Sequence, residues 1–278
     1  MIRFHRWPEP PCLDTIRTSR LKDLRSLIAQ KRRNPASDEI KGYNASGVKH
    51  DLWGQQAHKC CYCESRVKER HDDVEHFRPK GEAARAPGST EIHGYWWLSY
   101  SWENLLLSCK GCNQKPCKGV QFPLELGSAA LDGSLEQGPP GGEIPLLIDP
   151  AAEDPLCHIQ FRCEKRDGRD CWVPRPRDGS PRGVTTIRVC GLDRSELLDL
   201  YNKHVAVNVL REVREVDRTL ALGKRDDVWD VVLNAAERLM YPFQEWTGLA
   251  HDALNHFVPS DRLAPHHLVW PKPPFVRW

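Results

Sequence analysis

The sequence contains no long hydrophobic run, no apolar leader and no internal repeat. A helix needs about 20 consecutive apolar residues to cross a bilayer, and no stretch of the chain approaches that length. The first six residues, Met-Ile-Arg-Phe-His-Arg, lack the apolar run of a signal peptide. The 11 cysteines are an odd number, which fits a reducing compartment better than a framework of paired disulfides. We therefore expect a cytoplasmic protein with no membrane span.

A large excess of charge of one sign is also missing, because the net charge is only +2. Two regions are nevertheless basic. Residues 1–33 carry nine Lys or Arg against three acids, a local charge of +6, and residues 160–190 carry eight against four, a local charge of +4. Two basic patches suit a polyanionic partner such as a nucleic acid. A solvated helix face and a basic loop would have the same composition, so neither patch alone indicates a nucleic-acid partner.

Four cysteines form two Cys-x-x-Cys pairs: Cys60 with Cys63, and Cys109 with Cys112. This spacing is typical of a closed tetrahedral Zn²⁺ site with four thiolate ligands. The other seven cysteines show no repeated ligand spacing, and we expect them to be small buried hydrophobic residues. Cys61 and Cys117 lie close enough to the pairs to replace a neighbouring ligand. The sequence therefore predicts one structural zinc ion.

Residues suited to phosphodiester hydrolysis lie between and beside these pairs. His76 has the pKa range of a general base, and the side-chain amide or neighbouring carbonyl of Asn104 can hold its other ring nitrogen. Mg²⁺ takes one or two oxygen ligands from a protein, which Glu75 and Asn113 would supply, with Asp73 as the reserve carboxylate. Adjacent strand residues point to opposite faces, so Glu75 and His76 can share one centre only near a strand end.

The hydrophobic pattern predicts helices near both ends and short strands between them. Ser19 is a candidate N-cap for a helix that runs to about Arg33. From Ser195 onward, apolar residues recur at helical spacing. The remaining predicted elements are a short helix leading into Cys60, strands at 73–78, 145–150, 157–163 and 171–173, and helices at 226–240 and 243–257.

The order Cys-x-x-Cys, acidic residue and His, Asn-Leu, Cys-x-x-Cys-Asn resembles the HNH endonucleases, which have the ββα-metal fold. The resemblance covers roughly residues 58–124. It implies that His76 is the general base, that Asn104 orients it, and that Glu75 and Asn113 bind the catalytic metal. Asn113 stands where the family usually has a histidine, a substitution that the family admits. The stretch from His76 to Asn104 is longer than in compact members, so it holds an insertion.

Further segments look like the HNH subunits of Septu-type and retron-associated anti-phage systems. They include Cys-Tyr-Cys-Glu (61–64), Glu-His-Phe-Arg-Pro-Lys (75–80) and Pro-Leu-Leu-Ile-Asp-Pro (145–150). In those systems the nuclease works beside an ATPase with an ABC/SMC-like fold, so the resemblance implies such a partner. We expect the helices after Ser195 to contact it through exposed apolar residues.

We therefore predict an α+β fold with a zinc-stapled ββα-metal (HNH) core between helical N-terminal and C-terminal regions. The expected parts are a basic helical segment at 1–57, the core at 58–126, a loop with short strands at 127–190, and helices at 191–278. The expected function is a DNA endonuclease with structural Zn²⁺ and catalytic Mg²⁺ or Mn²⁺. The alternative is a zinc-stabilised nucleic-acid or protein adaptor without catalysis.

Four basic residues near this centre are candidates for contacts with DNA phosphates: Arg78, Lys80, Lys115 and Lys118. Each is equally well explained as a solvated surface charge.

Overall fold

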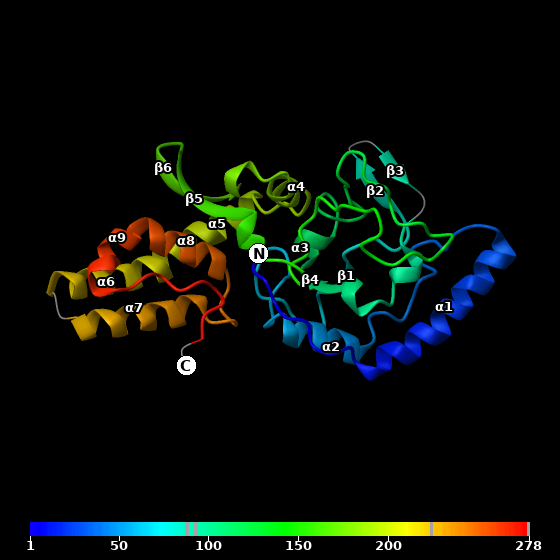
Figure 1. Cartoon of the computed structure of the whole chain (residues 1–278), viewed down its shortest axis with the longest axis horizontal. Coiled ribbons are helices and arrows are strands. Elements are labelled where there is room, and N and C mark those ends of the chain that lie inside the picture. Colours follow the sequence, from blue (N-terminus) through cyan, green and yellow to red (C-terminus); the bar gives the residue numbers. More distant parts are fainter. Residues whose placement is uncertain (87–88, 92–93, 223–224, 277–278) are drawn as a thin grey trace.

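The computed structural model describes residues 1–86, 89–91, 94–222 and 225–276. Figure 1 shows the helices and strands in two groups that lie side by side. Helices α1 and α2, strands β1 to β4 and helix α3 form the first group, and helices α5 to α9 form the second. The hairpin of β5 and β6 packs against α4, α5 and α8. The four-part division at residues 57, 126 and 190 stays a prediction.

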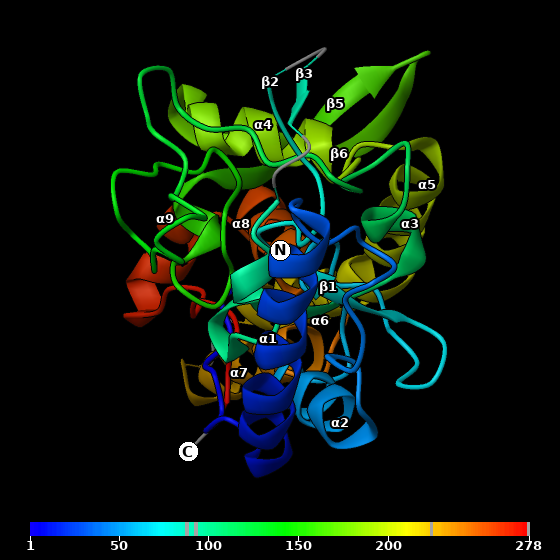
Figure 2. The ribbon, with the colours of Figure 1, turned by 90° about the vertical axis from the view of Figure 1, so that its right-hand side faces the viewer.

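The N-terminal group begins with two helices, α1 (Pro11–Lys31) and α2 (Ser46–Gln55), on the outer side of the molecule (Figure 2). The prediction that Ser19 caps the first helix is wrong, because α1 begins eight residues earlier, at Pro11. Proline is tolerated in the first turn of a helix, where its missing N–H needs no partner. Helix α2 leads toward Cys60, as the sequence predicts.

A strand–strand–helix unit follows. Strand β1 (Asp73–His76) pairs antiparallel with β4 (Leu105–Ser108), and the short helix α3 (Lys110–Asn113) comes directly after β4. Strand β1 is two residues shorter than predicted, because it ends at His76. The three leucines of β4 have no solvent exposure, so this strand is enclosed on both faces.

The long insertion between β1 and β4 supplies much of the core around this unit. It contains the small hairpin of β2 (Ala83–Ala86) and β3 (Ser89–Glu91) and two single 3₁₀ turns, Trp96–Leu98 and Trp102–Asn104. The insertion also carries an aromatic segment that packs into the core, because its large rings are buried: Tyr95, Trp96, Trp97, Tyr100 and Trp102.

The middle of the chain holds one clear hairpin, of β5 (Ile159–Arg166) and β6 (Arg169–Pro176). Its turn residues Asp167 and Gly168 have φ angles of 48° and 76°, the conformation that two-residue hairpins favour. The strand predicted at 145–150 is wrong, because only an isolated bridge between Leu124 and Pro145 forms there. Helix α4 (Pro181–Val189) follows the hairpin.

The C-terminal region is helical, as predicted. Helix α5 (Ser195–His204) continues through a π-helical turn (Val205–Val209) into α6 (Leu210–Leu222), and the predicted apolar stripe faces the core. Helices α7 (Arg225–Met240), α8 (Thr247–Phe257) and α9 (Ser260–Leu263) complete the region. Helix α8 begins four residues later than predicted.

The described residues thus combine helices with three two-stranded sheets, which confirms the predicted α+β class. Within these same ranges, no helix combines the length and the apolar character needed to cross a membrane.

Candidate functional site

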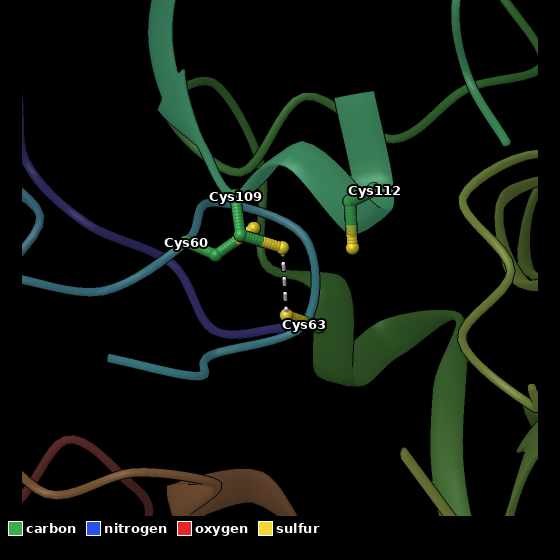
Figure 3. A group of neighbouring side chains, drawn as sticks. All are labelled: Cys60, Cys63, Cys109 and Cys112. Carbon is green, nitrogen blue, oxygen red and sulfur yellow. Dashed lines mark hydrogen bonds between the residues drawn. The ribbon is translucent and has the colours of Figure 1, made fainter. Parts of the chain in front are cut away.

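The four predicted cysteine ligands come together in one cluster (Figure 3). Their sulfur atoms all lie within 4.8 Å of one another, and the Sγ atoms of Cys63 and Cys109 are 3.7 Å apart. Four sulfurs placed tetrahedrally around Zn²⁺ at bonds of about 2.3 Å lie about 3.8 Å apart, so the observed spacing fits such an ion. The cluster could therefore hold a metal such as zinc.

Local hydrogen bonds shape the two cysteine pairs. In the first, the backbone N–H of Glu64 donates to the carbonyl of Cys60 at 3.1 Å, and Glu64 has a positive φ of 61°. The N–H of Cys61 donates to Leu107 at 3.1 Å, which attaches this turn to β4. In the second pair, the N–H of Cys112 donates to the carbonyl of Cys109 at 3.1 Å as α3 begins. The cluster therefore joins the turn that precedes β1 to the segment that follows β4.

Arg194, from the segment before α5, completes the surroundings of the cluster. Its Nη1 donates to the Sγ of Cys112 at 3.4 Å and to the carbonyl of Gly191 at 2.9 Å. Burial opposes the charge of this guanidinium, but the neighbouring cysteine thiolates outweigh burial and raise the pKa of Arg194. Four thiolates around one Zn²⁺ carry a net charge of −2, which a nearby cation partly neutralises. Sequence reasoning missed this residue, which lies 82 positions from Cys112.

Strand alternation separates the predicted carboxylate from the predicted base. Asp73 and Glu75 lie on one face of β1, and His76 lies on the other. His76 is the last residue of the strand, which is where the sequence argument required it to be.

The Glu75 side chain is buried and already has a cationic partner. The Nζ of Lys118 forms an ion pair with its carboxylate, and the Tyr62 hydroxyl donates to it at 3.2 Å. Burial raises the pKa of Glu75, and the charge of Lys118 opposes that rise. Lys118 also donates to the carbonyl of His76 at 2.8 Å and has no solvent exposure. The expectation that Lys118 contacts DNA phosphates is corrected here, because its ammonium group is enclosed and paired.

The imidazole of His76 is almost enclosed, at 6% exposure. Its Nε2 lies 3.0 Å from the carbonyl of Ser99, and because a carbonyl only accepts, Nε2 carries the proton and Nδ1 keeps a lone pair. The ring of Tyr43 makes a T-shaped contact with this imidazole, and the two ring centroids are 4.4 Å apart. Burial, followed by the charge of Lys80, lowers the pKa of His76 to about 3, so the ring is neutral near pH 7. Neutral imidazole is the form that accepts a proton.

Asn104 acts on the backbone beside His76 and not on its ring. Its Oδ1 accepts from the N–H of Arg78 at 2.8 Å, and its Nδ2 donates to the carbonyls of Arg78 and Leu98 at 3.1 and 3.2 Å. The expected contact of Asn104 with the His76 ring is therefore corrected: Ser99 provides that carbonyl. Asn104 instead holds the turn that follows the strand.

Asn113 lies beside Asp73, the reserve carboxylate, and its contact with Glu75 is not formed. The Nδ2 of Asn113 donates to Oδ2 of Asp73 at 3.1 Å, and the Nε2 of Gln114 lies 3.4 Å from the same oxygen. Asp73 and Asn113 are both partly exposed, whereas Glu75 is 4% exposed. Among the three predicted oxygen donors, Asp73 and Asn113 are thus the two that the structure brings together.

The other predicted phosphate contacts have different surroundings. Arg78 is buried and donates from Nε to Glu143 at 2.7 Å, so its expected DNA contact is also corrected. Lys80 is partly exposed, and its Nζ lies 2.8 Å from the Tyr43 hydroxyl. Burial lowers the pKa of Lys80 to about 8. Lys115 is exposed. Lys80 and Lys115 therefore remain accessible to a phosphate.

A cavity of about 620 Å³ lies between α1 and the loop near residue 132. Its walls include Arg25, Trp96 and Glu136, and none of the predicted site residues lines it. The chemistry expected from His76 therefore lies elsewhere.

Comparisons with known proteins place the chain in a family. No protein-family model matches it, and no solved structure matches it. It is 28% identical over 153 residues to Septu protein PtuB of Bacillus thuringiensis, which covers 54% of this chain and 43% of that protein. It is 27% identical over 143 residues to Septu protein PtuA of Bacillus mycoides (strain KBAB4), which covers 51% of this chain and 18% of that protein.

A further relative is aligned over most of both chains. The chain is 31% identical over 223 residues to Septu protein PtuB of Bacillus mycoides (strain KBAB4), an alignment that covers 78% of this chain and 71% of that protein. The chain belongs to the Septu PtuB family.

Proposed function

We propose that this chain is a metal-dependent HNH endonuclease that hydrolyses phosphodiester bonds of DNA. The observation that carries the proposal is the placement of His76 at the end of a strand whose partner strand leads directly into the helix that bears Asn113. A four-cysteine cluster fastens this strand–strand–helix unit together. A ββα-metal centre would be built from such parts, and His76 is neutral, as a general base must be, which supports the proposal.

We propose that Nδ1 of His76 takes the proton of the attacking water, because Nε2 is committed to Ser99. Asn104 acts as a positioning residue, since it holds the backbone of Arg78, two residues after His76. Lys80 and Lys115 would contact the phosphate groups of the strand that is cut.

The oxygen donors of the hairpin and of α3 fit a hard divalent cation in part. Asp73 and Asn113 offer neighbouring oxygen-bearing side chains at the partly exposed face of the hairpin, which suits Mg²⁺ or Mn²⁺. Glu75, the ligand that the family pattern names, would have to exchange Lys118 for the metal. When bound, the cation would polarise the scissile phosphate and support the leaving oxygen.

We further propose that the enzyme works in an anti-phage defence system with an ABC/SMC-like ATPase. Membership of the Septu PtuB family supports the system. The helices after Ser195 would form the partner surface, because they carry four large exposed apolar side chains: Leu200, Val207, Leu222 and Trp229. A pull-down of the ATPase by a chain that lacks residues 195–278 would contradict this surface.

Two observations favour the alternative, a zinc-stabilised adaptor without catalysis. Glu75 is neutralised by Lys118, and the ring of Tyr43 packs against His76 in a T-shaped contact. An adaptor would bind its partner equally well without His76, whereas a nuclease would lose its activity.

A plasmid-nicking assay on the protein co-purified with the neighbouring gene products decides between the two. We expect His76→Ala to abolish nicking in Mg²⁺ or Mn²⁺ with ATP, and to leave zinc content and solubility unchanged. His71→Ala is the matched control, because His71 is exposed and lies outside the hairpin. Nicking by His76→Ala at the wild-type rate would overturn the proposal.

A further inference from the structure

Four aromatic side chains form a continuous row between α2 and the segment that joins α7 to α8. The Trp53 indole stacks on the His58 imidazole, with ring centroids 3.4 Å apart and planes inclined by 8°. His58 meets the edge of Phe243 at 4.9 Å, and Phe243 lies at 6.0 Å from Tyr241 with an interplanar angle of 26°. None of these residues belongs to the proposed catalytic centre.

The row is only partly covered by protein. Phe243 is 39% exposed and Tyr241 is 37% exposed, and Trp53 and His58 are also partly exposed. Burial of large rings is a main source of folding free energy, so one exposed ring is ordinary. Four neighbouring rings that all remain accessible form a surface that can accept another planar group.

The backbone holds these rings in fixed positions. The carbonyl of Phe243 accepts from Nη2 of Arg66 at 3.0 Å, and the carbonyl of Gln244 accepts from Nζ of Lys59 at 2.8 Å. His58 has a φ of 62°, a left-handed conformation that is uncommon outside glycine, and it brings the imidazole flat onto Trp53. A surface fixed before binding loses little conformational entropy when a partner docks.

Exposed basic side chains follow His58 in the chain, and one of them contacts the row. Arg66, whose guanidinium contacts the backbone of Phe243, is exposed, and so are Lys68 and Arg70. Three acids lie among them, and each already has a partner: Glu69 lies 3.4 Å from His50, Glu245 accepts from the backbone N–H of Arg66 at 2.6 Å, and Asp72 accepts from the backbone N–H of Lys68 at 2.7 Å. Rings with basic side chains beside them suit a chain that alternates flat bases with phosphates, whereas a purely apolar partner would gain nothing from the charges.

We propose that this aromatic row is a stacking platform for single-stranded nucleic acid, with Arg66, Lys68 and Arg70 at the phosphates. Bases in a duplex are stacked on each other, so the exposed rings are available only to unpaired bases. The platform would make single-stranded nucleic acid the substrate of the proposed nuclease. Its role in cutting therefore rests on the proposed function. Binding of the nucleic acid depends on the platform alone.

Fluorescence anisotropy with a labelled oligo(dT) of about 16 nucleotides tests this, using the full zinc-loaded chain without added divalent cation. We expect the double variant Tyr241→Leu, Phe243→Leu to bind about 10-fold more weakly, because leucine keeps the apolar surface and removes the ring faces. The matched control is Leu126→Ala, Leu135→Ala, which changes two exposed apolar side chains that lie outside the row and outside the proposed partner surface. The control should bind like the wild type.

A crosslinking experiment locates the contact. An oligonucleotide that carries 5-iodouracil should crosslink on irradiation to Trp53, Tyr241 or Phe243, and a duplex of the same sequence should compete poorly. Equal affinity of the leucine variant and the wild type would overturn the platform, as would crosslinks confined to other segments. A variant that loses only a protein partner and keeps its affinity for oligo(dT) would instead assign the row to protein binding.

The platform and the proposed function fail in different ways. If His76→Ala still cuts DNA, the nuclease assignment fails and the platform stands on its binding data. If the leucine variant binds oligo(dT) normally and His76→Ala is inactive, the platform fails and the nuclease assignment stands.

Discussion

The ammonium group of Lys118 forms a buried ion pair with the carboxylate of Glu75. Lys118 is completely enclosed and Glu75 is 4% exposed, so both charges are removed from water. Such a pair is stable only when further hydrogen bonds satisfy both partners. The carbonyl of His76 and the hydroxyl of Tyr62 supply those bonds. The carboxylate beside the proposed catalytic histidine is thus bound to a cation supplied by the chain itself.

Lys118→Met should lower the free energy of unfolding by about 3–5 kcal/mol, because it leaves the Glu75 charge buried without a partner. Urea unfolding of the zinc-loaded protein measures this loss. The double variant Lys118→Met, Glu75→Gln should recover a large part of it, since both charges are then absent. Equal losses in the single and double variants would show that the pair itself is not responsible.

The parts of the site that sequence reasoning predicted are local in the chain. The four cysteines could be found because their ligands come in Cys-x-x-Cys turns, and each turn forms from neighbouring residues. Strand β1 could be found because it lies within the strand predicted at 73–78, which is also a pattern of neighbouring residues. These patterns depend on spacing alone, so a single sequence is sufficient to predict them.

The partners of the site could not be predicted, because they depend on packing between distant segments. Ser99 contacts the ring of His76 from within the insertion, and Arg194 contacts Cys112 from the segment before α5. Lys118 looked like a surface residue because nothing in its neighbourhood reveals that it is enclosed. The sequence also could not predict whether Glu75 or Asp73 contacts Asn113, because both carboxylates lie on the same face of β1. Packing of α3 against the strand decides for Asp73.

Arg194→Leu should weaken zinc binding about 10- to 100-fold, because the cysteine thiolates lose the cation that offsets their charge. Competition with a chromophoric chelator at constant pH measures the affinity. Arg188→Leu is the control, since Arg188 is exposed on α4. Arg194→Lys should fall between Arg194→Leu and the wild type, and wild-type affinity in Arg194→Leu would exclude the electrostatic role.

His204 should make the protein less stable in mild acid. Burial lowers its pKa from 6.5 to about 4, while the charge of Glu64 opposes that shift. The unfolded chain therefore binds a proton at a pH where the folded chain does not, so stability is complete above pH 6.5 and falls between pH 6.5 and 4. In His204→Leu, the slope of unfolding free energy against pH over this interval should decrease by about one proton.

The measurement for His204 is a set of urea unfolding curves between pH 7 and pH 4. Acid also protonates the zinc thiolates, but that loss is common to both proteins, so the difference between them isolates His204. His266→Leu provides the comparison for a partly exposed histidine. Parallel pH profiles for wild type and His204→Leu would show that the imidazole does not titrate in this interval.

Lys80 should set the upper pH limit of DNA cleavage if the proposed function holds. Burial lowers its pKa to about 8, with the charge of Asp38 opposing the shift, and its Nζ contacts the hydroxyl of Tyr43 beside His76. A cationic Lys80 would contact the phosphate, so the rate should be level below about pH 8 and fall as Lys80 loses its proton.

Lys80→Arg should remove that fall, because arginine stays charged, whereas Lys80→Met should cut slowly at every pH. Lys41→Arg should keep the wild-type profile, because Lys41 is exposed and follows Ile40, whose carbonyl accepts from Lys80. Cleavage rates measured at saturating DNA check this, and a fall that persists unchanged in Lys80→Arg would assign the limit to another group.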